Sequence, residues 1–156
     1  RAVAVQCAVE NCESLILVNR TQEKVDVLAA ELRPYLSDER VQGPDERISV
    51  CPWDTDALHA ALDHTDLIVN ATSIGMKRTD PELLPAHLIQ PHHMVYDMIY
   101  SPPRTKLLAA AEANGARTAN GLSMLVHQGA ISFEHWFNRP APVDIMRSAV
   151  LGAVES

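Results

Sequence analysis

The chain has 156 residues, of which 47% are hydrophobic and 21% are charged, and its formal net charge at pH 7 is -7. This composition can bury a hydrophobic core and differs from that of disordered proteins. An acidic balance argues against a nucleic-acid-binding protein, which needs a basic face. No apolar stretch reaches the roughly 20 residues of a membrane span. We therefore expect neither nucleic acid nor a membrane as a partner.

The three cysteines, Cys7, Cys12 and Cys51, are odd in number and show no CxxC spacing. This pattern indicates free thiols in a reducing compartment and gives neither a disulfide framework nor a zinc site. We expect a cytoplasmic protein with no metal centre.

In chain order, residues 1–10 are apolar and helix-like from the first position, with no Met, no capping residue and no preceding strand. A complete α/β domain would begin with a strand and a turn. We therefore expect the chain to start inside an existing fold, after a first strand and a glycine-rich loop.

Short apolar runs that end in small polar residues predict buried parallel strands separated by helices. The strands are predicted at residues 15–18, 48–51, 67–70, 94–98 and 116–119, the helices at 22–36, 55–62, 105–114, 122–137 and 143–153, and loops at 37–46 and 71–92. This alternation predicts an α/β fold with a doubly wound parallel sheet. Ligands of such sheets bind outside the carboxyl ends of the strands, so we expect the polar strand ends to line one crevice.

The first candidate site follows the strand at 15–18. NAD-binding proteins commonly place Asp or Glu here, where it accepts hydrogen bonds from the ribose 2′-hydroxyl. This chain has neutral Asn19, then Arg20, with Lys24 one helical turn later. Both cations suit a phosphate group, and the Thr21 hydroxyl and the helix N-terminus add donors. The pattern favours a 2′-phosphate site over the alternative of an N-capped helix with a solvated first turn.

The strand ends at 67–70 and 94–98 give further candidates. Small residues after Asn70 let a flat ligand lie against the backbone, and Thr72 and Ser73 can hydrogen-bond to it, although an ordinary polar turn is an equal alternative. Asp97 lies inside a buried run, so we expect it to be hydrogen-bonded and structural rather than catalytic. Tyr100, just past the strand, is the better candidate for contacting a ligand.

The last candidates lie around the strand-to-helix turn at Gly121, where backbone can approach a ligand closely. Gln128 is two helical turns further on and lies on a similar side, so its amide can hold a hydroxyl or a carboxylate. His127 falls on a different face, and we interpret it as a surface or packing histidine. His92 and His93 are expected to form a solvated pair, because no third metal ligand occurs at a useful spacing.

Together these motifs resemble the shikimate dehydrogenase family, and specifically its carboxyl-terminal NADP-binding domain. The match runs in order along nearly the whole chain, through Asn19-Arg20-Thr21 with Lys24, Asn70-Ala71-Thr72-Ser73 with Gly75-Met76, Tyr96-Asp97-Met98-Ile99-Tyr100, and Asn120-Gly121-Leu122 to Gln128-Gly129. Ser123 stands where the family often has glycine. The family reduces 3-dehydroshikimate to shikimate with NADPH in aromatic amino-acid biosynthesis.

The resemblance implies a Rossmann-like domain fragment over residues 1–156 with carboxyl-terminal helices, and it assigns residues to three positions. It implies that Asn19, Arg20, Thr21 and Lys24 surround the adenosine 2′-phosphate, that Thr72, Met98 and Gly121 border the cofactor near the nicotinamide, and that Tyr100 and Gln128 contact the substrate. No catalytic residue is assigned, because the family's catalytic Lys and Asp belong to an amino-terminal substrate domain that this chain does not match. A homodimer is a further expectation.

In the family's strand order, 3-2-1-4-5-6, the missing first strand lies between the strands at 15–18 and 67–70. Two facing edges would then be unpaired, so we expect the isolated chain to be unstable and inactive. Three alternative functions remain open: a quinate-using relative, an oxidoreductase like glutamyl-tRNA reductase, and an NADP-binding module without turnover.

Overall fold

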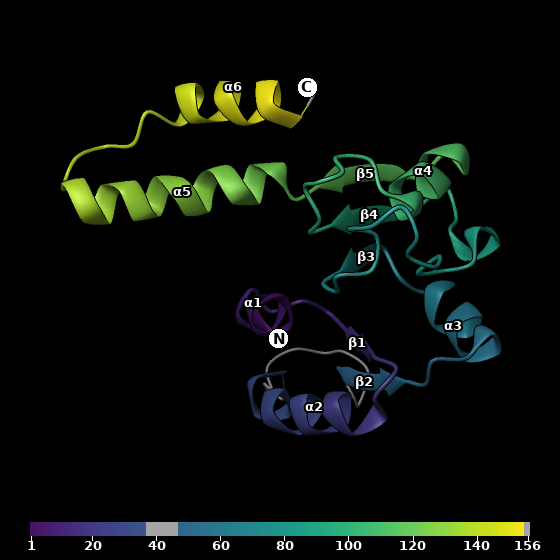
Figure 1. Cartoon of the computed structure of the whole chain (residues 1–156). Helices are drawn as coiled ribbons and strands as arrows, with labels where there is room; N and C mark the ends of the chain where they lie inside the picture. The colour runs from purple at the N-terminus through teal and green to yellow at the C-terminus, as the bar shows by residue number, and fades with distance from the viewer. Residues whose placement is uncertain (37–46, 155–156) are drawn as a thin grey trace. The chain divides into compact units, whose positions relative to one another are not determined.

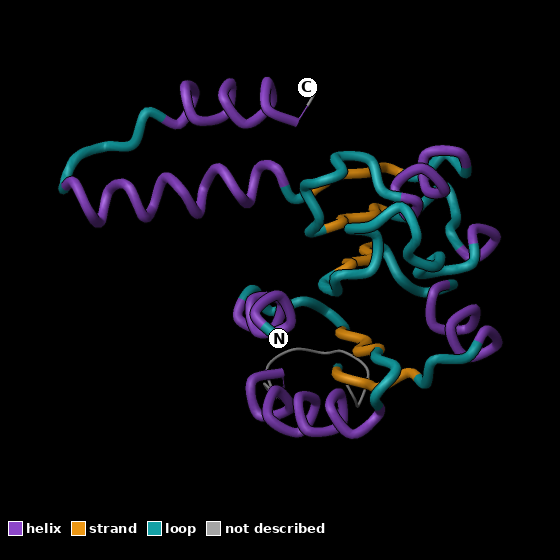
Figure 2. The backbone as a smooth tube through the Cα atoms, in the orientation of Figure 1, coloured by secondary structure: helices purple, strands orange, loops and turns teal. Residues whose placement is uncertain are grey.

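The computed structural model describes residues 1–36 and 47–154, so the loop predicted at 37–46 lies outside the described residues. The chain divides into two compact units, Arg1–His64 and Thr65–Ser156. Figures 1 and 2 show the helices and strands of both units.

The first unit is a two-stranded parallel sheet with helices. Its elements are α1 (Ala2–Val9), β1 (Leu15–Val18), α2 (Gln22–Leu36), β2 (Ile48–Cys51) and α3 (Thr55–Leu62). Strands β1 and β2 pair in parallel, with Leu15 opposite Ile48 and Val18 opposite Cys51. The apolar residues of α2 recur at helical spacing and form a stripe, which packs with α1 and the strands into one core. This core contains Ala4, Ala8, Leu17, Val25, Ala29, Leu32, Leu36 and Ile48.

Helix α3 begins as its sequence predicts. Asp54 is in an extended conformation, and its Oδ1 accepts a hydrogen bond of 3.0 Å from the backbone N–H of Ala57. This bond satisfies one of the free donors of the first helical turn. Pro34 lies inside α2, which nevertheless continues to Leu36.

The second unit contains a three-stranded parallel sheet in the order β3-β4-β5. Its elements are β3 (Leu67–Asn70), η1 (Ala86–Leu88), β4 (Met94–Asp97), α4 (Lys106–Ala113), β5 (Arg117–Asn120), α5 (Leu122–Phe137) and α6 (Val143–Val154). Val95 in the central strand has no exposed surface, and α4 buries Leu107, Leu108 and Ala111. Helix α5 starts at the end of β5, and α6 packs beside it (Figure 1).

Element boundaries differ from the predictions by about one residue. Strand β4 ends at Asp97, β5 runs one residue further than predicted, and α4 begins at Lys106 with Thr105 as its N-cap. The Thr105 hydroxyl accepts a bond of 3.3 Å from the Leu108 N–H. Gly115 follows α4 with φ +77°, as expected for a glycine that terminates a helix.

One prediction is wrong: His93 is not solvated. Its side chain has no exposed surface, and its Nδ1 accepts a hydrogen bond of 2.9 Å from the backbone N–H of Gln90. His93 immediately precedes β4, and its carbonyl accepts a bond from Arg117 of the neighbouring strand, so its side chain is held within the fold. His92 is exposed.

Across the described residues, no helix is long and apolar enough to cross a membrane. Both units have the α/β architecture that the sequence predicts, with parallel strands connected by helices. That a further strand belongs between β1 and β3 stays a prediction.

Candidate functional site

The end of β1 forms a tight turn into α2. The side-chain Oδ1 of Asn19 accepts a hydrogen bond of 2.8 Å from the backbone N–H of Thr21, and the Thr21 carbonyl accepts one of 3.2 Å from the Lys24 N–H. An Asn that binds the backbone two residues on is a common turn device. Asn19 therefore shapes the turn and places Arg20 and Thr21 at the start of the helix.

Arg20 and Lys24 are both exposed, and neither side chain forms a hydrogen bond or ion pair with any described residue. They flank the N-terminus of α2, a helix of 15 residues whose first N–H groups carry partial positive charge. Glu23 is the acidic residue of the same turn and is also exposed. Two cationic side chains without a partner among the described residues, beside a helix N-terminus, are chemically suited to binding a phosphate group.

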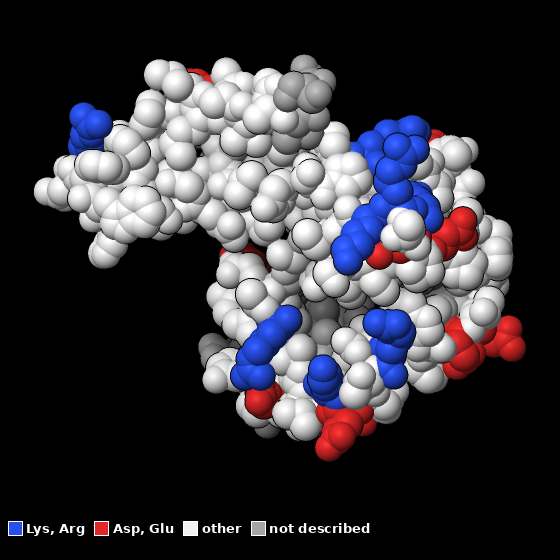
Figure 3. Space-filling view, viewed as in Figure 1, with Lys and Arg blue, Asp and Glu red and all other residues white. Residues whose placement is uncertain are grey.

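In the view of Figure 3, the Lys and Arg side chains of this acidic chain lie in separate groups, of which the largest is in the upper right of the picture. A cationic site must then be local, as the turn after β1 is.

In the second unit, the last residues of the three strands form a row. Asn70 of β3 is opposite Asp97 of β4, and Asp97 is opposite Asn120 of β5. All three lie at the carboxyl edge of the sheet, which is the edge where such sheets bind ligands. The structure thus brings three of the predicted polar strand ends together. That the end of β1 joins them stays a prediction.

Asp97 is the centre of this row. It is fully buried, and its Oδ1 accepts bonds of 3.0 Å from Asn70 Nδ2 and 3.1 Å from the Ile99 N–H, while its Oδ2 accepts one of 2.6 Å from Thr105 Oγ1. The prediction that buried Asp97 is hydrogen-bonded is confirmed, and its structural rather than catalytic role stays a prediction.

Thr72 is exposed at the start of the loop after β3, but its hydroxyl is already engaged. It donates to Asn70 Oδ1 at 2.8 Å and accepts from the Ile74 N–H at 3.1 Å. The Thr72 backbone N–H also donates to Asn70 Oδ1, at 3.0 Å. Its methyl group and one remaining hydroxyl lone pair are what it can offer a ligand.

Gly121 is required for close packing of protein backbone. Its φ is −75°, which any residue can adopt, but a Cβ would clash with the carbonyl oxygen of Met98 and lie 2.6 Å from the Met98 carbonyl carbon. The Gly121 N–H donates to the Ile99 carbonyl at 3.1 Å. The turn before α5 therefore rests directly on the segment after β4 that carries Met98 and Tyr100.

The two predicted substrate residues are accessible. Tyr100 follows β4 and is 41% exposed, and Gln128 lies exposed on α5. The backbone carbonyl of Gln128 accepts from Ser132 Oγ at 3.0 Å, a bond that does not involve the side-chain amide. His127 is exposed, as its interpretation as a surface residue requires.

The loop after Thr72 is organised by Asp80, which the sequence did not single out. Asp80 Oδ2 accepts bonds of 2.9 Å from the N–H groups of both Lys77 and Gly75. The backbone donor of Lys77, then that of Gly75, holds the pKa of Asp80 below its usual value. Gly75 has φ +113°, a conformation that favours glycine.

Sequence reasoning also missed the supporting roles of Thr105 and Asn120. Asn120 Nδ2 donates to the Pro103 carbonyl at 2.9 Å, and Asn120 Oδ1 accepts from the Leu122 N–H at 3.2 Å. The sequence did contain one signal for these roles, because a polar residue occurs at the same position, the last residue, of all three strands.

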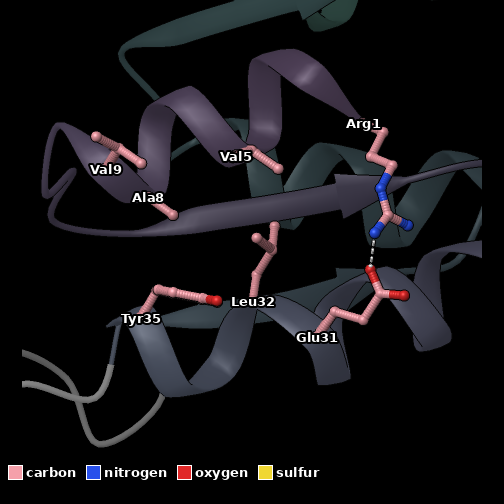
Figure 4. A pocket seen from close by; sticks show the side chains of 7 residues that line it. All are labelled: Arg1, Val5, Ala8, Val9, Glu31, Leu32 and Tyr35. Carbon is pink, nitrogen blue, oxygen red and sulfur yellow. Dashed lines mark ion pairs between the residues drawn. The ribbon is translucent and has the colours of Figure 1, made fainter.

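The first unit also contains a pocket of about 450 Å³. Figure 4 shows it between α1 and α2, lined by Arg1, Val5, Ala8, Val9, Glu31, Leu32 and Tyr35. Arg1 and Glu31 form an ion pair across it at 2.5 Å. None of the predicted site residues lines it. Within the described part of the chain, no group of three or more His, Cys, Asp or Glu side chains could hold a metal ion.

Parallel strands connected by helices, with polar groups at the carboxyl ends of the strands, are the architecture of Rossmann-like α/β folds. A family model described as "Shikimate 5'-dehydrogenase C-terminal domain" matches residues 121–151, which contain all of α5 and most of α6.

Individual relatives match almost the whole chain. The shikimate dehydrogenase (NADP(+)) of Symbiobacterium thermophilum is 40% identical over 158 residues, covering 99% of this chain and 51% of that protein. A crystal structure of a shikimate dehydrogenase in complex with NADP+ is 34% identical, with a TM-score of 0.76, and the match covers 90% of this chain and 47% of that one. Shikimate 5-dehydrogenase from Thermus thermophilus, solved with NADP(H) and shikimate, is 28% identical with a TM-score of 0.74, covering 97% and 50%.

Over nearly its whole length the chain is similar to shikimate dehydrogenases, and residues 121–151 match the model of that family's carboxyl-terminal domain. It spans about half the length of the curated relatives it matches.

Proposed function

We propose that this chain is the cofactor-binding part of an NADP-dependent oxidoreductase that reduces 3-dehydroshikimate to shikimate. The observation that carries the proposal is the turn after β1, where exposed Arg20 and Lys24 have no partner among the described residues and where Asn19 replaces the acidic residue typical of NAD sites. The relatives named NADP-dependent shikimate dehydrogenases support it.

The residues at this turn fit the adenosine 2′-phosphate of NADP. The guanidinium of Arg20 offers a planar set of donors to phosphate oxygens, and Lys24 adds a charge one helical turn away. Thr21 and the first N–H groups of α2 supply further donors. A carboxylate in place of Asn19 would repel the phosphate.

In the second unit, we assign Thr72, Met98 and Gly121 to the border of the nicotinamide site, and Tyr100 and Gln128 to the substrate. The bound cofactor supplies the hydride, and this chain's residues orient cofactor and substrate. Tyr100 and Gln128 are exposed polar side chains that can hydrogen-bond to the hydroxyl and carboxylate groups of a shikimate-like ring.

We further propose that proton transfer depends on a lysine and an aspartate in a separate substrate domain, which corresponds to the half of the relatives that this chain does not match. This chain would then position the substrate without carrying the proton. Free thiols at Cys7, Cys12 and Cys51 support a reducing, cytoplasmic location.

The test is steady-state kinetics of the full-length protein with shikimate and with quinate, each against NADP+ and NAD+. We expect the highest kcat/KM with shikimate and NADP+. A preference for quinate would favour the quinate-using relative. NADP+ binding with no turnover of either acid would refute the enzyme assignment in favour of a binding module.

A further inference from the structure

Two loops at the carboxyl edge of the sheet β3-β4-β5, those after β3 and after β4, are joined through hydrogen bonds to buried Asp97. Asn70 holds the loop after β3, since its Oδ1 accepts from Thr72 and its Nδ2 donates to the Ile74 carbonyl at 3.1 Å. The same Nδ2 donates to Asp97. Asp97 in turn holds the segment after β4 through the Ile99 N–H and the Thr105 hydroxyl. One carboxylate therefore connects the loop of Thr72 with the segment of Tyr100.

The packing of these loops leaves little room for them to shift separately. A Cβ on Gly75 would lie 3.2 Å from the Ile99 side chain and 3.5 Å from that of Thr105. Lys106 Nζ donates to the Asp80 carbonyl at 2.6 Å, which is a second connection between the same two segments. The loops after β3 and β4 are thus connected at more points than Asp97 alone.

A fully buried carboxylate at the end of a strand is energetically unfavourable by itself. Burying a charge costs free energy unless hydrogen bonds compensate it. The strand itself does not require the charge, because Val95 is equally buried two residues earlier and is apolar. What Asp97 provides, and an apolar residue would not, is simultaneous acceptance from Asn70 at the end of β3 and from two donors in the segment after β4.

We propose that Asp97 is a positioning residue that fixes Thr72, on the cofactor side, relative to Tyr100, on the substrate side. The inference rests on the proposed function for these two assignments. Hydride transfer needs its two partners within a narrow range of distance and angle, and a displacement of about 1 Å can cost on the order of 100-fold in rate. Asp97 acts through Asn70, Ile99 and Thr105 and does not itself contact the substrate.

The test removes one bond to Asp97 at a residue outside the assigned contacts. In the full-length protein, Thr105→Val deletes the hydroxyl that donates to Asp97 while keeping the side-chain shape, and Thr105→Ser restores it. We expect Thr105→Val to lower kcat/KM for shikimate about 10-fold or more, and Thr105→Ser to remain close to the unmodified protein.

A double-mutant cycle with Tyr100→Phe separates positioning from general damage. If Asp97 positions Tyr100, the loss caused by Thr105→Val shrinks several-fold once the Tyr100 hydroxyl is gone. The control is Val95→Ala, which truncates a buried side chain in the same strand. We expect this variant to have a lower melting temperature but an unchanged kcat/KM at temperatures where it is folded. Equal losses from Thr105→Val in both backgrounds would overturn the inference.

Hydrogen exchange gives a readout that does not depend on turnover. The amides of Thr72 and Ile99 are bonded to Asn70 and Asp97, so Thr105→Val should accelerate exchange at both. Acceleration at Ile99 alone would contradict a connection between the loops. No turnover of shikimate by the unmodified protein would refute the proposed function, while joint acceleration would still support the coupling.

Discussion

Among the described residues, each unit has a buried charged side chain that holds several segments, but the two lie at opposite ends of their strands. In the first unit it is Arg47, just before β2, whose guanidinium donates to the Asn11 side chain at 2.9 Å and to the carbonyls of Cys12, Glu13 and Leu36. In the second unit it is Asp97, the last residue of β4. Arg47 lies at the amino ends of the strands and Asp97 at the carboxyl ends.

Because of this difference, the residues that stabilise the first unit are distinct from its candidate binding residues, whereas in the second unit the two sets overlap. In the first unit the supporting network is at the edge away from the turn of Arg20 and Lys24, so the cations can be changed at little cost to folding. In the second unit the supporting network lies among the candidate site residues themselves. Changes there should alter the free energy of unfolding and the geometry of binding together.

The largest expected effect is that of Asp97→Ala. It removes the acceptor of three buried donors, those of Asn70, Ile99 and Thr105, and we expect a loss of about 3 kcal/mol or more in the free energy of unfolding. Urea denaturation of the full-length protein and its variant measures this loss. A loss below about 1 kcal/mol would mean that water or a rearranged loop replaces the carboxylate.

Arg47→Met should come next. It keeps much of the side-chain volume and removes the donors to Asn11, Cys12, Glu13 and Leu36, for an expected loss of about 2–3 kcal/mol. The affinity for NADP+ should stay unchanged at temperatures where the protein remains folded. A large rise in the Kd for NADP+ without loss of stability would contradict the separation of the two edges.

Gly121→Ala and Gly152→Ala form a matched pair. The Cβ at Gly121 meets the Met98 backbone, which cannot move aside cheaply, so we expect a loss of about 1–3 kcal/mol. Gly152 lies exposed in α6 with nothing within 4 Å of an added Cβ. There alanine should stabilise the helix by about 0.5–1 kcal/mol. Thermal melts of both variants test this difference. Equal changes in melting temperature would contradict the clash predicted at Gly121.

The smallest effect is that of pH on the loop of Asp80. Because backbone N–H groups lower its pKa in the folded state, ionised Asp80 stabilises the loop at pH values above the pKa of the unfolded chain, and this contribution is lost as pH falls through the folded pKa. The melting-temperature difference between the unmodified protein and Asp80→Asn should be constant above about pH 5 and shrink in acid. A difference that grows in acid would contradict this assignment.

The positions of the elements could be predicted well because local signals determine them. Short apolar runs, the 3.6-residue pattern of α2, the cap at Asp54 and Gly115 after α4 all act over a few residues. The role of Asp97 could also be predicted, since a carboxylate within a buried run needs donors.

The remaining features depend on register and tertiary packing, which a single sequence does not show. Asn70 meets Asp97 only because β3 and β4 pair with their last residues opposite each other. His93 is buried by the position of its strand, although its neighbour His92 is exposed. Arg47 reads as a surface charge at the end of a polar stretch until the fold places carbonyl groups around it.

The most direct measurement compares cofactor affinities of the full-length protein by titration calorimetry, for the unmodified form and for Arg20→Ala with Lys24→Ala. We predict that the Kd for NADP+ rises on the order of 10- to 100-fold, as expected for loss of charge-assisted bonds worth about 1.5–3 kcal/mol, while the Kd for NAD+ barely changes. Equal changes in both affinities, or none in either, would show that these two cations do not hold the 2′-phosphate.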